Sequence, residues 1–94
     1  MRRIRIKLRL FATLRDKYGI NETTVECNGT LEDLLKVVEE KFGEEFIKEF
    51  FDKSEGRIRE DRLIFLNGIH MKSFSKIELK DGDVISIFPP VGGG

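Results

Sequence analysis

A strict alternation of apolar and basic residues close to the N-terminus constrains this chain most. Between Ile4 and Leu10, every even-numbered residue is isoleucine or leucine and every odd-numbered residue is arginine or lysine. A repeat of two is typical of a β-strand that turns one face to a core and the other to solvent. The chain is therefore expected to build a sheet around this strand.

A second strand is expected shortly afterwards. The residues Thr23, Thr24 and Val25 are β-branched and follow the turn signal at residues 16–19. Such residues favour extended backbone. We predict that residues 1–28 form a β-hairpin that ends near Asn28-Gly29.

Three further strands are predicted in the C-terminal half. The segments Leu63–Leu66 and Ile69–Met71 flank Asn67-Gly68, a dipeptide that accepts the positive φ angles of a type I′ turn. The last strand, Val84–Phe88, should end at Pro89-Pro90, because proline has no backbone N–H to donate to a sheet.

Two helices are expected between these groups of strands. Thr30 and Asp33 resemble a capping box, and Gly43 supplies a stop. Between them, apolar residues recur at helical spacing: Leu31, Leu34, Leu35, Val38 and Phe42. A shorter stripe in Glu44–Phe51 predicts a second helix that packs into the core, and the charged stretch Asp52–Arg62 is expected to be a loop.

The order of elements predicts one α+β domain over residues 1–88 and a tail over residues 89–94. The chain has 94 residues, and a chain of this size buries roughly 60–68% of its unfolded surface. That is enough for one core but too little for a core and a deep cofactor cavity. We therefore expect no bound cofactor and no nucleotide-dependent activity in this chain alone.

Charge and hydropathy exclude other classes of function. The chain has 17 basic and 17 acidic residues, so it lacks the basic excess typical of nucleic-acid binding. No run approaches the roughly 18 apolar residues of a membrane span, and the N-terminal alternation differs from a signal peptide. The protein is expected in the cytoplasm, without a nucleic-acid or membrane partner. Cys27 and His70 are the only cysteine and histidine, which is too few for a structural zinc site or a disulfide.

The segment after the last strand is rich in glycine and has no serine, so its composition favours a tail that presents its carboxylate to another protein over a linker. Val91 is followed by Gly92, Gly93 and Gly94. Glycine has no Cβ, so such a tail can enter a channel too narrow for side chains. At roughly 3.3–3.6 Å per extended residue, residues 91–94 reach about 13–14 Å. Pro89 and Pro90 restrict the chain before the glycines and reduce the entropy lost on docking.

Two phenylalanines are expected on the outer face of the sheet, although an early end or bulge in the first strand would instead turn Phe11 into the core. Phe11 is odd-numbered like the basic residues of the first strand, so it should share their face. In the last strand, Ile85 and Ile87 should face the core, so Phe88 should point to the outer face. Leaving each ring in water forfeits roughly 1.5–3 kcal/mol. A partner-binding surface would explain that exposure.

The chain resembles the ubiquitin-like sulfur carriers, and within them the small subunit of molybdopterin synthase. The motifs that carry the resemblance are residues 10–15, Thr30, residues 66–68, residues 79–84, and residues 88–91 with Gly93-Gly94. The predicted second helix and the two prolines favour this branch over the thiamine carriers. The resemblance implies a β-grasp fold, with a mixed sheet of about five strands packed on one main helix and a short second helix.

The resemblance also implies chemistry at the C-terminal carboxyl group of Gly94. An adenylating enzyme similar to the ubiquitin-activating enzymes would use ATP to join this carboxylate to AMP, and a sulfur donor would displace AMP to leave a thiocarboxylate. The tail, Pro89 to Gly94, would then insert into the large subunit of molybdopterin synthase, in an expected heterotetramer. There it would give sulfur to a pterin precursor of the molybdenum or tungsten cofactor.

The resemblance places Phe11, Phe88 and His70 on the partner surface, and His70 departs from members that have an apolar residue there. Other functions fit the same tail. A ubiquitin-like modifier would join Gly94 to lysines of other proteins, and a related carrier would supply thiamine synthesis or tRNA thiolation. A plain binding module would make no use of the glycines.

Overall fold

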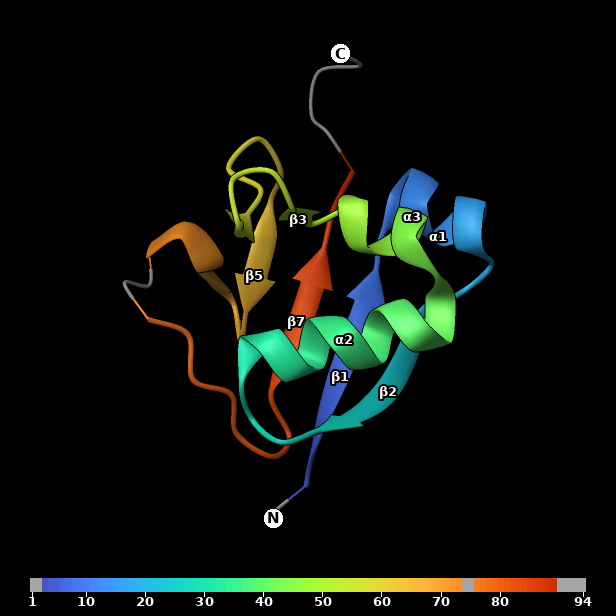
Figure 1. The fold of residues 1–94 in the computed structure, drawn as a ribbon. Helices are drawn as coiled ribbons and strands as arrows, with labels where there is room; N and C mark the ends of the chain where they lie inside the picture. The colour runs from blue at the N-terminus through green and yellow to red at the C-terminus, as the bar shows by residue number, and fades with distance from the viewer. Residues whose placement is uncertain (1–2, 74–75, 90–94) are drawn as a thin grey trace.

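A computed structural model describes residues 3–73 and 76–89 of the chain (Figure 1). Its centre is a five-stranded mixed sheet with the order β2-β1-β7-β5-β6. The strands of this sheet are β1 (Ile4–Leu10), β2 (Glu22–Cys27), β5 (Ile64–Leu66), β6 (Ile69–His70) and β7 (Val84–Ile87). This architecture confirms the predicted α+β fold with a sheet of five strands.

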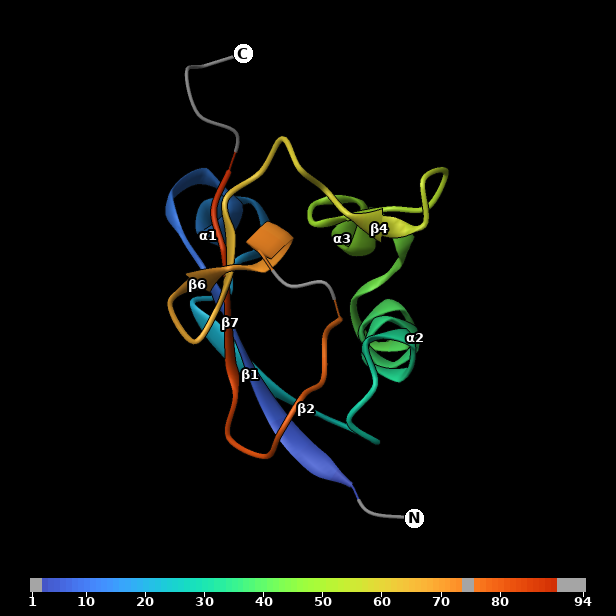
Figure 2. The same ribbon diagram turned by 90° about the vertical axis from the view of Figure 1, so that its left-hand side faces the viewer.

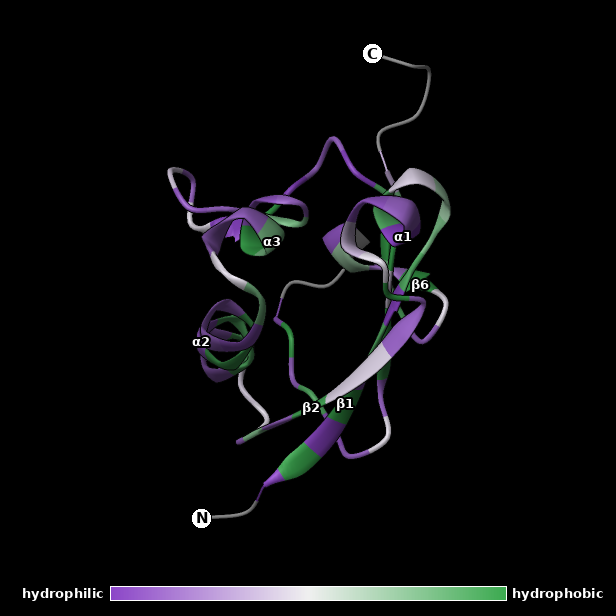
Figure 3. Cartoon of the chain, turned by 90° about the vertical axis from the view of Figure 1, so that its right-hand side faces the viewer, coloured by the Kyte–Doolittle hydropathy of each residue, from purple (hydrophilic) through white to green (hydrophobic). Residues whose placement is uncertain are grey.

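The alternation of β1 places it at the middle of the molecule. Its four apolar residues are buried, and the basic residues between them lie on the other face of the sheet, as the alternating bands of Figure 3 show. β1 pairs antiparallel with β2, from Ile4 opposite Cys27 to Arg9 opposite Glu22. It pairs parallel with β7, where Leu10 lies opposite Ile87. The first and last strands therefore end at the same edge of the sheet.

One main helix packs across the buried face of the sheet. α2 (Leu31–Phe42) begins at Thr30, whose Oγ1 accepts the N–H of Asp33 at 3.1 Å. It ends at Gly43, where φ is +97°. Such a φ is rarely adopted by residues with a Cβ. The predicted start and stop of this helix are both confirmed.

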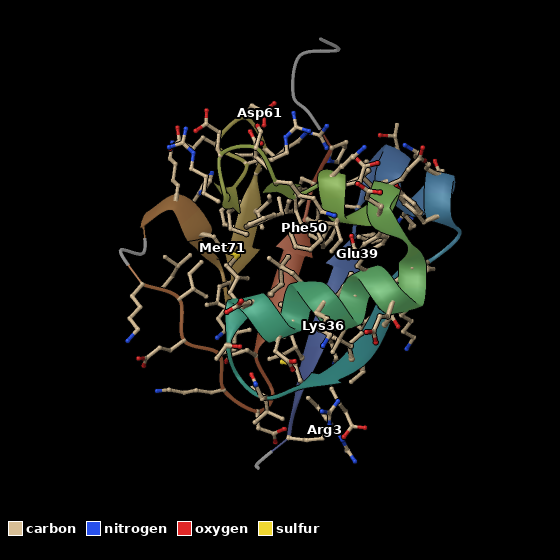
Figure 4. The ribbon with its side chains drawn as sticks, viewed as in Figure 1. Arg3, Lys36, Glu39, Phe50, Asp61 and Met71 are labelled. Carbon is tan, nitrogen blue, oxygen red and sulfur yellow. The ribbon has the colours of Figure 1, made fainter. Side chains whose placement is uncertain are left out.

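A short second helix, α3 (Glu44–Lys48), follows directly and lies on the same side of the sheet as α2 (Figure 2). Phe46, Ile47 and Phe50 are almost completely buried, and Figure 4 shows Phe50 in the interior. Phe46 packs edge-on against Phe50, with ring centroids 6.3 Å apart. The apolar stripe predicted for this segment is therefore core, although the helix ends three residues before Phe51.

The structure corrects the prediction of a simple hairpin over residues 1–28. The two strands pair as expected, but a helix, α1 (Ala12–Tyr18), lies between them. It ends at Gly19, where φ is +67°. Leu14 is its only buried residue. With the partly buried Tyr18 it forms a single i, i+4 pair, which is too short to show a helical period.

The predicted loop and the predicted fourth strand also need correction. The stretch Asp52–Arg62 contains part of a second, two-stranded sheet, formed by β3 (Phe51–Asp52) and β4 (Arg57–Ile58). Two-residue strands carry too little pattern to be predicted. Met71 does not extend β6 but begins a 3-10 helix, η1 (Met71–Ser73), and is buried.

The turn between β5 and β6 has the expected geometry and is fastened to the start of β7. Asn67 and Gly68 have φ of +51° and +86°, as a type I′ turn requires. The Asn67 side chain accepts the Val84 N–H at 2.9 Å and donates to Asp83 at 2.9 Å. Asp83 in turn accepts the N–H of Lys80 at 2.8 Å. Residues 66–68 and 79–84, two of the motifs that carry the family resemblance, are thus joined by side-chain hydrogen bonds, and we call this connection the lock.

Two further expectations from the sequence concern Cys27 and membrane-spanning helices. Cys27 is fully buried, as predicted for a small apolar group. Burial raises the pKa of its thiol, which makes it a poor nucleophile. Among the described residues, no helix combines the length and the hydrophobicity needed to cross a membrane.

Candidate partner-binding surface

Four aromatic side chains from four segments meet on the outer face of the sheet. This aromatic cluster consists of Phe11, Phe65, His70 and Phe88. The rings of Phe11 and Phe88 stack with centroids 4.3 Å apart and an angle of 9° between their planes. Phe65 meets Phe88 edge-on at 5.7 Å, and its centroid lies 5.3 Å from that of His70.

Strand parity and backbone hydrogen bonds place the two stacked rings. Phe11 follows the last residue of β1 in extended conformation, with φ −124° and ψ 152°, and its N–H donates to Ile87 O at 3.2 Å. Phe88 follows the last residue of β7, and its N–H donates to Leu63 O at 3.1 Å. Both rings therefore lie at the edge of the sheet where β7 leads into Pro89.

Phe65 and His70 extend the cluster across the sheet. Phe65 lies between the buried Ile64 and Leu66, so it faces outward, opposite Ser86 on one side and His70 on the other. His70 Nδ1 accepts the N–H of Lys72 at 3.3 Å. All four rings are half-buried, because they cover one another only in part.

Apolar and basic side chains border the cluster. Leu63 and Ile69 are the large hydrophobic residues most exposed in the described chain, at 37% and 54%. Leu63 shares the strand parity of Phe65 and its carbonyl accepts the Phe88 N–H, so it borders the cluster. Ile69 pairs with the buried Leu66 and therefore lies on the other face of the sheet. The Arg9 guanidinium carbon lies 5.4 Å from the centre of the Phe11 ring. Arg9 also pairs with Glu22 at 3.5 Å. The surface thus has an apolar centre with a charged border, which is typical of protein interfaces.

A partly buried ion pair lies near this end of the sheet. Arg62 Nη1 lies 2.9 Å from Glu49 Oε1, and their side chains are only 12% and 13% exposed. Lys17 and Tyr18 donate to the other carboxylate oxygen at 3.0 and 2.8 Å. Burial raises the pKa of Glu49, but hydrogen bonds from Arg62, Lys17 and Tyr18 outweigh burial, and the net pKa is lowered. Glu49 is therefore a charged structural group at neutral pH.

Some of the predicted site residues lie in the described part of the chain and others lie outside it. The structure brings Phe11, Phe88 and His70 into one cluster, as the parity of the strands and the resemblance led us to expect. Pro89 is half-buried at the end of the described chain. The remaining tail residues, Pro90, Val91, Gly92, Gly93 and Gly94, lie outside the described residues.

Sequence reasoning missed Phe65 and the ion pair. Phe65 had a signal, because it alternates with two apolar residues in a predicted strand. Glu49 and Arg62 had none, since their contacts join segments far apart in the sequence. Within residues 3–73 and 76–89, no three His, Cys, Asp or Glu side chains are placed to hold a metal ion. The described surface offers half-buried apolar rings, a feature typical of surfaces that bind other proteins.

The mixed sheet with one main helix across it, and the motif that runs through Pro89 into the glycines, define a ubiquitin-like β-grasp protein. Comparison with known families supports this class directly. The model of the ThiS family matches residues 8–94. The chain therefore belongs to the ThiS family of ubiquitin-like sulfur carriers and modifiers.

Individual relatives cover nearly the whole chain. Small archaeal modifier protein 3 of Haloferax volcanii is 31% identical over 100 residues, covering 95% of this chain and 98% of that protein. The solution structure of small archaeal modifier protein 1 from Methanosarcina acetivorans has 26% identity and a TM-score of 0.72, with 100% of both chains covered. The complex of subunits 1 and 2 of the Helicobacter pylori molybdopterin-converting factor matches with 26% identity and a TM-score of 0.58, covering 97% of this chain and 100% of that chain.

Proposed function

We propose that this protein is a sulfur carrier that acts as the small subunit of molybdopterin synthase. The observation that carries the proposal is the aromatic cluster at the edge of the sheet where β7 leads into the tail. A docking surface beside the base of a slender tail allows a partner to hold the domain and receive the tail at the same time. The similarity to the Helicobacter pylori molybdopterin-converting factor supports the choice of partner.

The proposed chemistry takes place at the Gly94 carboxyl group and begins in an adenylating enzyme. The carboxylate attacks the α-phosphorus of ATP, which gives an acyl adenylate and pyrophosphate. A sulfur donor then displaces AMP and leaves a thiocarboxylate. Sulfur is a stronger nucleophile than the carboxylate oxygen, so the loaded terminus can attack a substrate that the free carboxylate cannot.

Delivery requires a second partner, the large subunit of molybdopterin synthase, in a heterotetramer with two copies of each chain. The tail, Pro89 to Gly94, would enter its active site and give up sulfur to the pterin precursor, and water would restore the carboxylate. The chain itself would bind neither ATP nor a metal. Both reactions would occur in the cytoplasm.

Conjugation to proteins is the second candidate function. It is favoured by the 31% identity to a small archaeal modifier protein over almost the full chain. The same acyl adenylate can be attacked by a lysine amine instead of a sulfur nucleophile, which would give an isopeptide bond. Both functions use Gly94 and the same first step. They differ in the product, which is a thiocarboxylate for the carrier and an isopeptide bond for the modifier.

Mass spectrometry of the protein from its native host distinguishes these products. For a carrier, we expect the intact chain with one carboxyl oxygen replaced by sulfur, and a fragment that places the sulfur at Gly94. For a modifier, trypsin gives a diagnostic branched peptide. Lys80 is the last basic residue of the chain, so residues 81–94 would remain attached to a lysine of the target.

A variant without Gly94, expressed in the same host, is the matched control. It retains every described residue, yet it should carry neither sulfur nor a branched peptide. A thiocarboxylate on the complete chain alone would support the carrier, whereas branched peptides without a thiocarboxylate would support the modifier. An unmodified terminus under conditions of active cofactor synthesis would contradict both functions.

A further inference from the structure

A single carboxylate, that of Glu49, joins the two segments that flank the end of β7. From the last turn of α1, Lys17 Nζ and Tyr18 Oη lie 3.0 and 2.8 Å from Glu49 Oε2. From the segment before β5, Arg62 Nη1 lies 2.9 Å from Glu49 Oε1 and also donates to the Glu49 carbonyl at 3.0 Å. Both oxygens of this carboxylate are therefore occupied, each by a different segment.

Each of these segments leads directly to a backbone group that holds β7. α1 begins immediately after Phe11, whose N–H donates to Ile87 O at 3.2 Å. Arg62 is followed by Leu63, whose carbonyl accepts the N–H of Phe88 at 3.1 Å. The last residues before Pro89 are thus held on both sides by segments that Glu49 connects.

We propose that Glu49 is a positioning residue that fixes the base of the tail relative to the aromatic cluster. The proposal rests on the proposed function, because it assumes that the tail delivers a reactive terminus. A partner that binds the cluster receives the terminus in the correct place only if Phe88 and Pro89 hold a fixed position. Glu49 touches none of the reacting atoms and acts through Leu63 and Phe11.

The ion pair is suited to this task because it is largely removed from water. Glu49 and Arg62 are 13% and 12% exposed, and removing one member of such a pair leaves the other without compensation. A nearby pair offers a matched control. Arg59 and Asp61 interact at 2.6 Å in the same segment, but Asp61 is 61% exposed and lies at the surface of the molecule (Figure 4).

Amide hydrogen exchange followed by NMR tests the proposal without any partner. In Glu49→Gln, we expect the amides of Phe11 and Phe88 to exchange about tenfold faster, while amides in the β1–β2 ladder change little. Asp61→Asn should leave all of these rates unchanged. Equal acceleration of every amide in Glu49→Gln would overturn the proposal, because it would show a general loss of stability.

A second variant keeps the test decisive if Glu49→Gln does not fold. Tyr18→Phe removes one hydrogen bond to Glu49 and retains the ring, whose centroid lies 5.0 Å from that of Phe46. We expect faster exchange at Phe11, with a smaller change at Phe88. No change at Phe11 would contradict the proposed link through α1.

Kinetics with the adenylating enzyme and sulfur donor provide the functional readout. For Glu49→Gln, we expect kcat for thiocarboxylate formation to fall by about ten- to a hundredfold, because misplacement of a reacting group acts on kcat. KM should stay close to that of Asp61→Asn, since the cluster is intact. Equal kcat in the two variants would overturn the proposal. If the unaltered protein acquires no sulfur, the proposed function fails, and the exchange rates still decide the role of Glu49.

Discussion

At the scale of single residues, the arrangement of Phe11 and Phe88 explains why apolar side chains remain on an outer face. Their stacking removes part of each ring from water, so the isolated domain tolerates them, but neither is fully buried. The remaining exposed area is available to a partner. Phe65 completes the arrangement by covering the Phe88 ring edge-on.

The substitution Phe88→Asp should therefore affect binding more than folding. Loss of the aromatic contacts should lower the free energy of unfolding by about 1–2 kcal/mol. A ring at the centre of the interface contributes at least about 2 kcal/mol to binding, so Kd for the large synthase subunit should rise by about thirtyfold or more. Calorimetric titration and denaturant unfolding measure the two quantities.

Phe42→Asp is the matched control for this prediction. Phe42 is also half-buried and stacks on one phenylalanine, Phe46, with centroids 4.8 Å apart. It lies at the end of α2, away from the aromatic cluster. We expect a similar loss of stability with unchanged partner binding. If Phe88→Asp instead unfolds the protein, the ring belongs to the core and the proposed surface is wrong.

The Glu49 carboxylate predicts how stability depends on pH. Its pKa in the folded protein lies below the ordinary value of 4.5, so the unfolded chain binds the proton more readily. Its contribution to stability is complete above the ordinary pKa and is lost as the pH falls through the lowered one. We expect the free energy of unfolding of Glu49→Gln to depend less on pH in this acidic range than that of the unaltered protein. Parallel curves from urea unfolding would contradict this assignment.

At the scale of elements, sequence patterns predicted those elements that bury a repeating face. β1 and α2 each have several core residues at regular spacing, so their position and the cap at Thr30 followed from the sequence. α1 has one buried residue, and β3 and β4 have two residues each. These elements depend on tertiary contacts rather than on local pattern.

The same distinction applies to the candidate site. Phe11 and Phe88 could be predicted because parity along two parallel strands decides where a side chain points. The contacts of Glu49 could not, because Lys17, Glu49 and Arg62 come from three separate segments. Parity of β5 would also have predicted Phe65, since its two neighbours in the strand are apolar.

The lock between the β5–β6 turn and β7 gives a prediction for these elements. Asn67→Ala removes two side-chain hydrogen bonds and places alanine at a φ of +51°. We expect a loss of about 2–3 kcal/mol in the free energy of unfolding. Asn21→Ala is the control, since this exposed side chain makes no hydrogen bond in the described part of the chain. Equal effects of the two substitutions would show that the lock contributes nothing.

At the scale of the whole molecule, docking and delivery are carried by different parts. All residues of the described core lie between Ile4 and Ile87, and the aromatic cluster ends at Phe88. The proposed chemistry lies wholly beyond Pro89. A partner can therefore recognise the domain whether or not the terminus carries sulfur, and the tail can be altered without rebuilding the docking surface.

This separation predicts that a chain shortened after Pro89 is a competitive inhibitor. It should fold with an unchanged melting temperature, because its core and sheet are complete, and it should accept no sulfur. It should still bind the large subunit and reduce sulfur transfer from the complete protein, with an inhibition constant close to the Kd of the complete protein. The same shortened chain with Phe88→Asp should inhibit far less. A lowered melting temperature would show that the tail packs on the domain, and failure to inhibit would show that the tail, rather than the aromatic cluster, provides most of the binding energy.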